Sequence, residues 1–118
     1  MVEIKYFKPG RVAEMVGEEH VEEILKGYLT SVSDVLTDLR TCWLKKDLEQ
    51  VRVFSHRIKS STRLIGADDL ADDFQQIETD TESAELNICD DMSRLTGIEV
   101  KCNHLKEEIE SYLNSATH

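Results

Sequence analysis

Residues 19–45 read EHVEEILKGYLTSVSDVLTDLRTCWLK, and their apolar side chains recur at steps of three and four residues. On a helix of about 3.6 residues per turn, this spacing places them on one face, as a stripe about five turns long. The pattern predicts a long amphipathic helix, whose stripe must be buried against other elements. The stripe consists of Val21, Ile24, Leu25, Tyr28, Leu29, Val32, Val35, Leu36 and Leu39.

Two more stripes of the same kind predict helices near residues 47–65 and 88–114. A shorter helix is predicted at about 68–82, with Asp68 or Asp69 available as its N-cap. No stretch alternates apolar and polar residues for long enough to indicate a strand. The sequence therefore favours helices over β-strands.

Pro9 can open one more short helix, because proline is tolerated in a first helical turn. Short connections between long amphipathic helices favour antiparallel neighbours. We expect residues 1–118 to form a single all-α domain, an antiparallel up-down four-helix bundle with an extra short N-terminal helix over one end. Gly27 and Gly97 fall inside predicted helices and mark either close helix packing, a kink or tolerated surface positions.

Composition limits the classes of function. With 40% hydrophobic and 32% charged residues among 118, the chain is expected to fold as a soluble globular domain. Its formal charge of −10 disfavours nucleic acid and membrane surfaces as partners. The longest apolar run, residues 42–44, is too short to cross a membrane, and no signal peptide is visible, so the expected location is the cytoplasm.

The cysteines and the other histidines give no sign of a metal site. Cys42, Cys89 and Cys102 form no CxxC pair, so we expect reduced thiols, at least one of them in the core. The histidines lack ligand spacing, and no metal is predicted.

Residues 55–67, SHRIKSSTRLIGA, carry the chemistry. His56 and Lys59 are three residues apart and therefore lie one above the other on a helix. Arg52, Ser60 and Arg63 share their face. The apolar residues of this helix point to the opposite side, so His56 is predicted to face water; these residues are Val51, Phe54, Ile58 and Ile65.

Charge is unevenly distributed around this motif. Residues 45–65 contain six Lys and Arg against two Asp and Glu, whereas residues 67–91 contain ten acids and no Lys or Arg. A positive island thus surrounds His56, and we interpret the acidic segment as a solvated face. An anion would be attracted to the island.

A neutral imidazole, available near neutral pH, has one nitrogen with a free lone pair and can attack phosphorus. A lysine one turn away can hold phosphoryl oxygens and offset their charge. His56 and Lys59 therefore suit phosphoryl transfer.

Residues 56–67, HRIKSSTRLIGA, resemble the signature of the histidine-phosphotransfer (HPt) family of phosphorelays, roughly H-x-[LI]-K-G-[SA]-[SA]-x-x-[LIV]-G-A. The main departure is Ser60, where the family usually has glycine. The resemblance extends over most of the chain and implies a four-helix bundle with the histidine on its second long helix. It also places Glu78, 22 residues after His56, close to the imidazole. Gly66 is expected to end its helix in the left-handed conformation, followed by Ala67.

The resemblance implies a phosphocarrier rather than a nucleotide-dependent kinase. His56 would accept a phosphoryl group from a receiver-domain aspartyl phosphate and pass it to the aspartate of another receiver, in a hybrid kinase or a response regulator. Lys59 would stabilise the phosphoryl group, while Arg52, Ser60, Arg63 and Glu78 would lie near the site or contact the receiver. The chain would need no cofactor of its own, because the receiver supplies Mg²⁺, and it is expected to be a monomer.

Other histidine-bearing helical modules are weaker alternatives. Histidine kinase dimerisation domains follow their histidine with an acid and later a proline, where this chain has Arg57 and Ser61. The phosphotransfer domain of chemotaxis kinases shares H-x-x-K but continues into a kinase. A receiver-binding module with an idle histidine is a third possibility. Whether the domain is free-standing or the C-terminal part of a membrane-bound hybrid kinase stays open.

Overall fold

Five α-helices make up most of the structure, a computed structural model that describes residues 5–83 and 85–116. They are α1 (Pro9–Val16), α2 (Val21–Leu44), α3 (Leu48–Leu64), α4 (Asp68–Asp80) and α5 (Met92–Ala116), with 3-10 turns at Glu18–His20 and Ile88–Asp90. The described residues contain no strand. The prediction of an all-α chain is confirmed.

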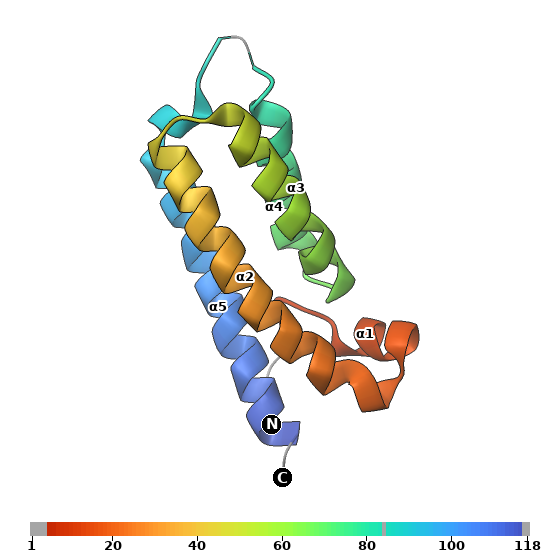
Figure 1. Ribbon diagram of the computed structural model, residues 1–118. Helices are drawn as coiled ribbons and strands as arrows, with labels where there is room; N and C mark the ends of the chain where they lie inside the picture. The colour runs from red at the N-terminus through yellow and green to blue at the C-terminus, as the bar shows by residue number, and fades with distance from the viewer. Residues whose placement is uncertain (1–4, 84, 117–118) are drawn as a thin grey trace.

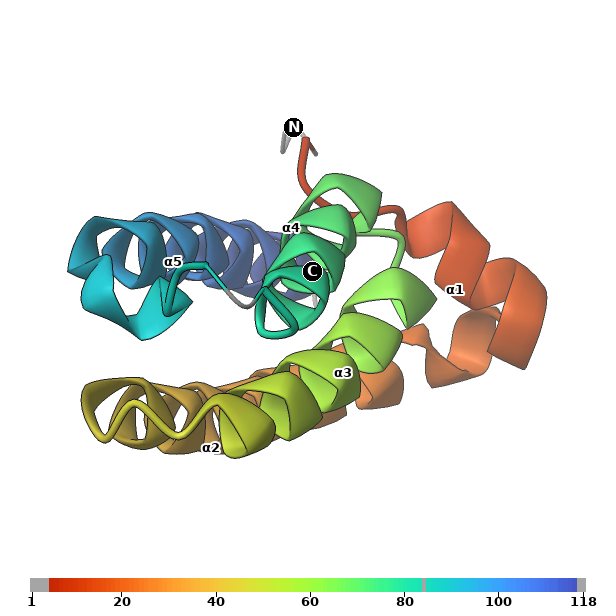
Figure 2. The same cartoon turned by 90° about the horizontal axis from the view of Figure 1, so that it is seen from above.

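The four long helices lie side by side (Figure 1). Three residues connect α2 to α3, three connect α3 to α4, and eleven connect α4 to α5. Seen from above, α2 and α3 lie in one layer and α4 and α5 in the other (Figure 2). The closest packing is between α3 and α4, the two helices that carry the chemical motif and the acidic segment. The short helix α1 lies at one end, beside the start of α2 (Figure 1).

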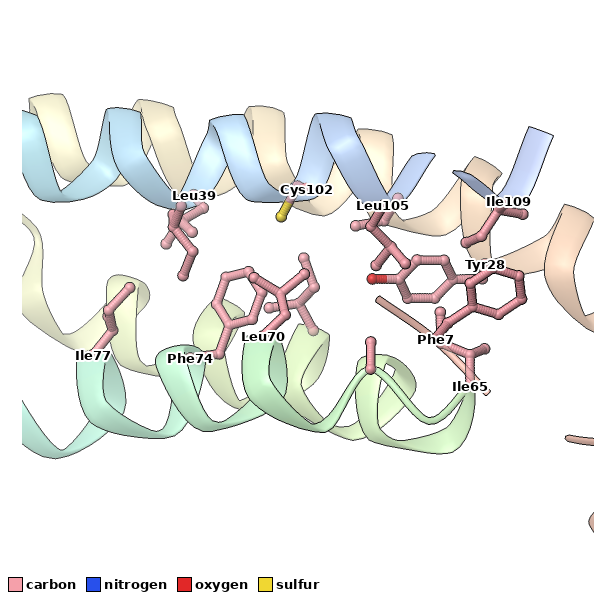
Figure 3. Close-up of a cluster of buried hydrophobic side chains, with 14 of the residues drawn as sticks. Phe7, Tyr28, Leu39, Ile65, Leu70, Phe74, Ile77, Cys102, Leu105 and Ile109 are labelled. Atoms are coloured by element: carbon pink, nitrogen blue, oxygen red, sulfur yellow. The ribbon is translucent and has the colours of Figure 1, made fainter. Parts of the chain in front are cut away.

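The core runs the length of the space between these layers (Figure 3). Trp43 and Leu39 of α2, Phe74 of α4 and Leu105 of α5 are completely or almost completely buried. The stripe of α2 is wider than its interface, because several of its predicted core residues are only half-buried. These are Ile24, Leu29, Val35 and Leu36.

Two buried polar side chains tie α2 to α3. The hydroxyls of Tyr28 and Thr62 lie 2.8 Å apart and share a hydrogen bond. Burial raises the pKa of Tyr28, so this phenol stays protonated and able to donate. A shift of α3 along α2 would separate the two hydroxyls and leave both unpaired in the core, so the pair opposes such a shift.

Helix α3 ends in a Schellman motif at Gly66. The Gly66 amide donates to the Arg63 carbonyl at 3.0 Å, and the Ala67 amide donates to the Thr62 carbonyl at 3.1 Å. Gly66 has a φ of 81°, in the left-handed region. The Lys8 amide also donates to the carbonyl of Ile65, which brings the N-terminal segment against this turn.

The prediction that Asp68 or Asp69 caps the N-terminus of α4 is wrong. Ala67 occupies the cap position and has no side-chain cap hydrogen bond, while Asp68 is the first residue of the helix. The Asp68 carboxylate instead binds the Arg11 guanidinium through two contacts of 2.6 and 2.9 Å, and Lys8 at 3.3 Å. The Asp68 carboxylate, which the sequence predicted as a helix cap, therefore forms a tertiary ion pair instead.

The expected start of the last helix is also wrong. Residues Ile88–Asp90 form a separate 3-10 turn, and α5 begins at Met92. The Asp91 side chain accepts hydrogen bonds from the amides of Ser93 and Arg94, which satisfies donors in the first turn. The apolar stripe crosses this break because Ile88 is buried like the residues of the helix itself.

The structure shows the surroundings of the two glycines inside helices and of the three cysteines. A Cβ at Gly27 or Gly97 would meet nothing within 4 Å, so neither position marks close helix packing. Cys89 and Cys102 are buried and Cys42 is half-buried, and all three thiols are free. Burial raises their pKa values, that of Cys102 to about 12.

None of the described helices is both long enough and apolar enough to cross a membrane.

Candidate functional site

His56 lies in the middle of α3, on the face that points away from the core. Its side chain is 62% exposed, whereas its neighbours Ser55 and Ile58 are buried. The helix period produces this contrast, because the apolar residues that anchor α3 lie on its other side. The imidazole is therefore accessible to a molecule that approaches from solvent.

Glu78 of α4 holds one edge of the imidazole. Its Oε1 lies 3.0 Å from His56 Nδ1. A carboxylate can only accept a hydrogen bond, so Nδ1 carries the proton. In the neutral ring, the lone pair is then on Nε2, the nitrogen that Glu78 does not hold. The contact thus selects one tautomer and fixes the ring orientation.

Lys59 lies one turn after His56 and binds the same carboxylate. Its Nζ is 2.8 Å from Glu78 Oε2 and 2.7 Å from Gln75 Oε1. Its side chain is only 16% exposed, so most of it is covered by neighbouring residues. Two of the three ammonium protons have acceptors, and one is left for another oxygen.

The charge of Glu78 is stabilised by these neighbours. Burial alone would raise the pKa of its carboxyl, but the hydrogen bonds from Lys59 and His56 outweigh that effect and lower the pKa below its usual 4.5. Glu78 is consequently ionised at neutral pH. A negative group is thereby fixed between the imidazole and the ammonium.

The other residues suggested by the motif are more dispersed. Ser60 turns its hydroxyl back to the His56 carbonyl at 3.3 Å, along its own helix. Arg63 binds Asp72 of α4 at 3.1 Å instead of approaching His56. Arg52 is exposed and has no ion pair with any residue in the described ranges. Gly66 lies ten positions after His56, about 15 Å along the helix axis, and belongs to the helix end rather than to the site.

Sequence reasoning missed Gln75 and Thr79. Gln75 lies three residues before Glu78 on the same face of α4, and its Nε2 lies 3.3 Å from the Thr79 hydroxyl. The spacing within α4 was visible in the sequence, but the register of α4 against α3 was not. That register is what places Gln75 opposite Lys59.

The acidic segment is not simply a solvated face, which corrects its interpretation from sequence. Several of its carboxylates bind basic residues of other elements, and no group of three or more metal-binding side chains occurs among the described residues. These ion pairs include Asp68–Arg11, Asp72–Arg63, Asp73–Lys101, Asp80–Arg94 and Asp90–Lys46.

An all-helical domain that presents a histidine from one of its long helices, beside a lysine one turn on, has the features of a histidine phosphotransfer domain. The family model of the Hpt domain matches residues 23–115 of the chain. The chain therefore belongs to the Hpt domain family, as the motif at residues 56–67 indicated. Neither the curated proteins nor the solved structures gave a match to it.

Members of this family carry phosphoryl groups on histidine in two-component phosphorelays, without kinase activity of their own in general. They interact with receiver domains of response regulators and kinases. The match covers α3 and α4 completely, the two helices that contribute the contacts around His56.

Proposed function

We propose that this chain is a phosphorelay intermediate in which His56 accepts a phosphoryl group from the aspartyl phosphate of one receiver domain and passes it to the aspartate of another. The observation that carries the proposal is the Glu78 contact to Nδ1 of an otherwise exposed imidazole. That contact leaves Nε2 as the nucleophile on the open side.

The transfer step uses groups already in place. The Nε2 lone pair of His56 attacks phosphorus while the bond from phosphorus to the aspartyl oxygen breaks, and the receiver's carboxylate leaves with the electron pair. The ring becomes positively charged, and Glu78 at Nδ1 stabilises that charge. The remaining N–H of Lys59 can donate to a phosphoryl oxygen. Transfer to the second receiver is the reverse of this step.

The receiver contributes the rest of the chemistry. Its acidic pocket would bring Mg²⁺, so the chain would need no metal or nucleotide of its own. We further propose that the long helices form the antiparallel up-down bundle typical of the family, and that the domain works in the cytoplasm as a monomer. It would act either alone or as the C-terminal domain of a membrane-bound hybrid kinase.

The proposal is tested by incubating the chain with a receiver domain that carries labelled aspartyl phosphate, together with Mg²⁺. We expect the label to move to the chain, to resist alkali and to be lost in acid, as phosphohistidine does. His56→Gln keeps a polar side chain at an exposed position and should fold normally but accept no label. His104→Gln, at a histidine stacked on Tyr6, is the matched control and should accept label as the wild type does.

Label on the chain that survives in His56→Gln would show that another residue is the acceptor. Receiver binding without any transfer, from several phosphorylated receivers, would instead identify a module with an idle histidine. Either result would overturn the proposal.

A further inference from the structure

Gln75 contacts the ammonium of Lys59 from α4. Its Oε1 accepts a hydrogen bond from Lys59 Nζ at 2.7 Å, and its Nε2 donates to the Thr79 hydroxyl at 3.3 Å. The contact with Lys59 decides the orientation of the amide, since only the amide oxygen can accept a hydrogen bond from an ammonium. Gln75 is thus oriented with its acceptor toward Lys59.

The two acceptors of Lys59 differ in charge. Glu78 already binds the ammonium at 2.8 Å and also holds His56. Without Gln75, the flexible Lys59 would be free to pair with Glu78 alone. It would then compete more strongly with His56 for the Glu78 carboxylate, which orients the imidazole. A neutral amide attracts the ammonium to a second point without cancelling any of its charge.

Neutrality matters because the phosphoryl group is an anion. The cluster of neutral His56, Lys59, Glu78 and Gln75 has one positive and one negative charge. A carboxylate at position 75 would give it a net negative charge, in direct contact with the group that must attract phosphoryl oxygens.

We infer that Gln75 is a positioning residue that acts through Lys59: it holds the ammonium between α3 and α4, beside the phosphoryl group that His56 would carry. This inference rests on the proposed function and adds a residue that the family motif at 56–67 does not contain. The side-chain hydrogen bonds of Gln75 go to Lys59 and Thr79, and none goes to His56.

The test uses phosphoramidate as a small phosphoryl donor, so that receiver docking plays no part. Nε2 of His56 attacks its phosphorus, the bond from phosphorus to nitrogen breaks, and ammonia leaves after taking up a proton. The initial rate of phosphohistidine formation is measured by intact mass. We expect Gln75→Ala to react roughly fivefold more slowly than the wild type, the scale of a contact at a partly exposed site. Gln75→Glu, nearly identical in shape, should be slower still.

Gln76→Ala is the matched control. Gln76 is the next residue on α4, but its amide binds Asp80 at 3.0 Å, away from Lys59. We expect this variant to react at the wild-type rate. Gln75 is exposed, so all three variants should unfold at nearly the wild-type denaturant midpoint.

A double-mutant cycle separates positioning from a general structural effect. In a Lys59→Met background, Gln75→Ala should cause no further loss, because the group through which it acts is gone. Equal rates for Gln75→Ala and Gln76→Ala would overturn the inference. So would an undiminished effect of Gln75→Ala in the Lys59→Met protein.

Failure of the inference is distinguishable from failure of the proposed function. Wild-type protein that forms phosphohistidine at position 56 with both phosphoramidate and a receiver keeps the proposed function, whatever the Gln75 variants do. If the wild type takes no label from either donor, the proposed function fails, and the inference fails with it.

Discussion

Glu78 is the residue on which the local chemistry of the site depends, because it contacts both His56 and Lys59. Each of its two oxygens binds a different partner, so one carboxylate orients the nucleophile and places the cation. The family resemblance predicted the closeness of Glu78 to the ring. Composition and periodicity could not have done so, since a single glutamate on an amphipathic helix is usually only a solvated side chain. Gln75 was not predicted either, because a single glutamine on an amphipathic helix is also usually a solvated side chain.

Glu78→Gln should lower the free energy of unfolding at neutral pH, because Lys59 then loses its only carboxylate among the described residues. The pKa of Glu78 is lower in the folded chain than its usual 4.5, so the folded state is stabilised by its charge above that value. This stabilisation is lost as the pH falls through the lower folded-state pKa. The difference between wild type and Glu78→Gln should therefore shrink on acidification.

Urea unfolding at a series of pH values between 7 and 2.5 measures this difference. Glu82→Gln, at an exposed position four residues after Glu78 and just beyond the end of α4, with no ion pair in the described ranges, should differ little from the wild type at any pH. A Glu78→Gln effect of constant size across the series would contradict the prediction.

At the scale of the elements, the hydrophobic pattern predicted the helices well because each buries a regular stripe. The helix expected at 19–45 is observed as Val21–Leu44, and that expected at 47–65 as Leu48–Leu64. The errors lie at helix ends, where tertiary contacts compete with local rules. The Asp68 carboxylate binds Arg11 instead of capping α4, and an apolar stripe continues from a 3-10 turn into α5. Arg11 lies far from Asp68 in the sequence, whereas the Asp91 side chain that accepts from the amides of Ser93 and Arg94 is a local signal.

The end of α3 offers a test at this scale. Gly66→Ala should destabilise the chain by about 2 kcal/mol or more, because alanine is strained in the left-handed region. Its Cβ would also lie 2.5 Å from Lys8 Cβ and 2.9 Å from the Lys8 amide nitrogen, so the N-terminal segment would have to shift. Gly27→Ala is the matched substitution inside α2, where a Cβ meets nothing within 4 Å. It should stabilise the chain by up to about 1 kcal/mol.

Chemical denaturation of both variants at neutral pH checks the two signs together. Because Gly66 lies far along the helix from His56, the Gly66→Ala protein should still accept phosphoryl groups wherever it remains folded. Unchanged stability in Gly66→Ala would show that the turn can relax, and that glycine at this position of the motif is not required for the helix end.

At the scale of the whole molecule, charge is distributed unevenly along the chain. The chain has a formal charge of −10, yet many acids of residues 67–91 are bound to basic side chains of other elements. On α3, Arg52 has no carboxylate partner among the described residues, and Arg57 lies over the ring of Phe54 at 5.4 Å. Arg52 and Arg57 are therefore more available to an external anion than the total charge suggests.

This arrangement makes receiver-dependent transfer sensitive to salt. A receiver presents an acidic pocket, so Arg52 should speed the encounter through long-range attraction, which ions screen over about 10 Å at 0.1 M and about 3 Å at 1 M. We expect Arg52→Ala to slow transfer from a phosphorylated receiver several-fold at low salt, and the difference from the wild type to disappear near 1 M.

Phosphorylation by phosphoramidate should change little in the same variant, since no protein surface docks. Lys26→Ala, on α2 and already paired with Glu22, should leave both reactions unchanged. A salt-independent loss in Arg52→Ala, equal for both donors, would instead place Arg52 in the chemical step at His56.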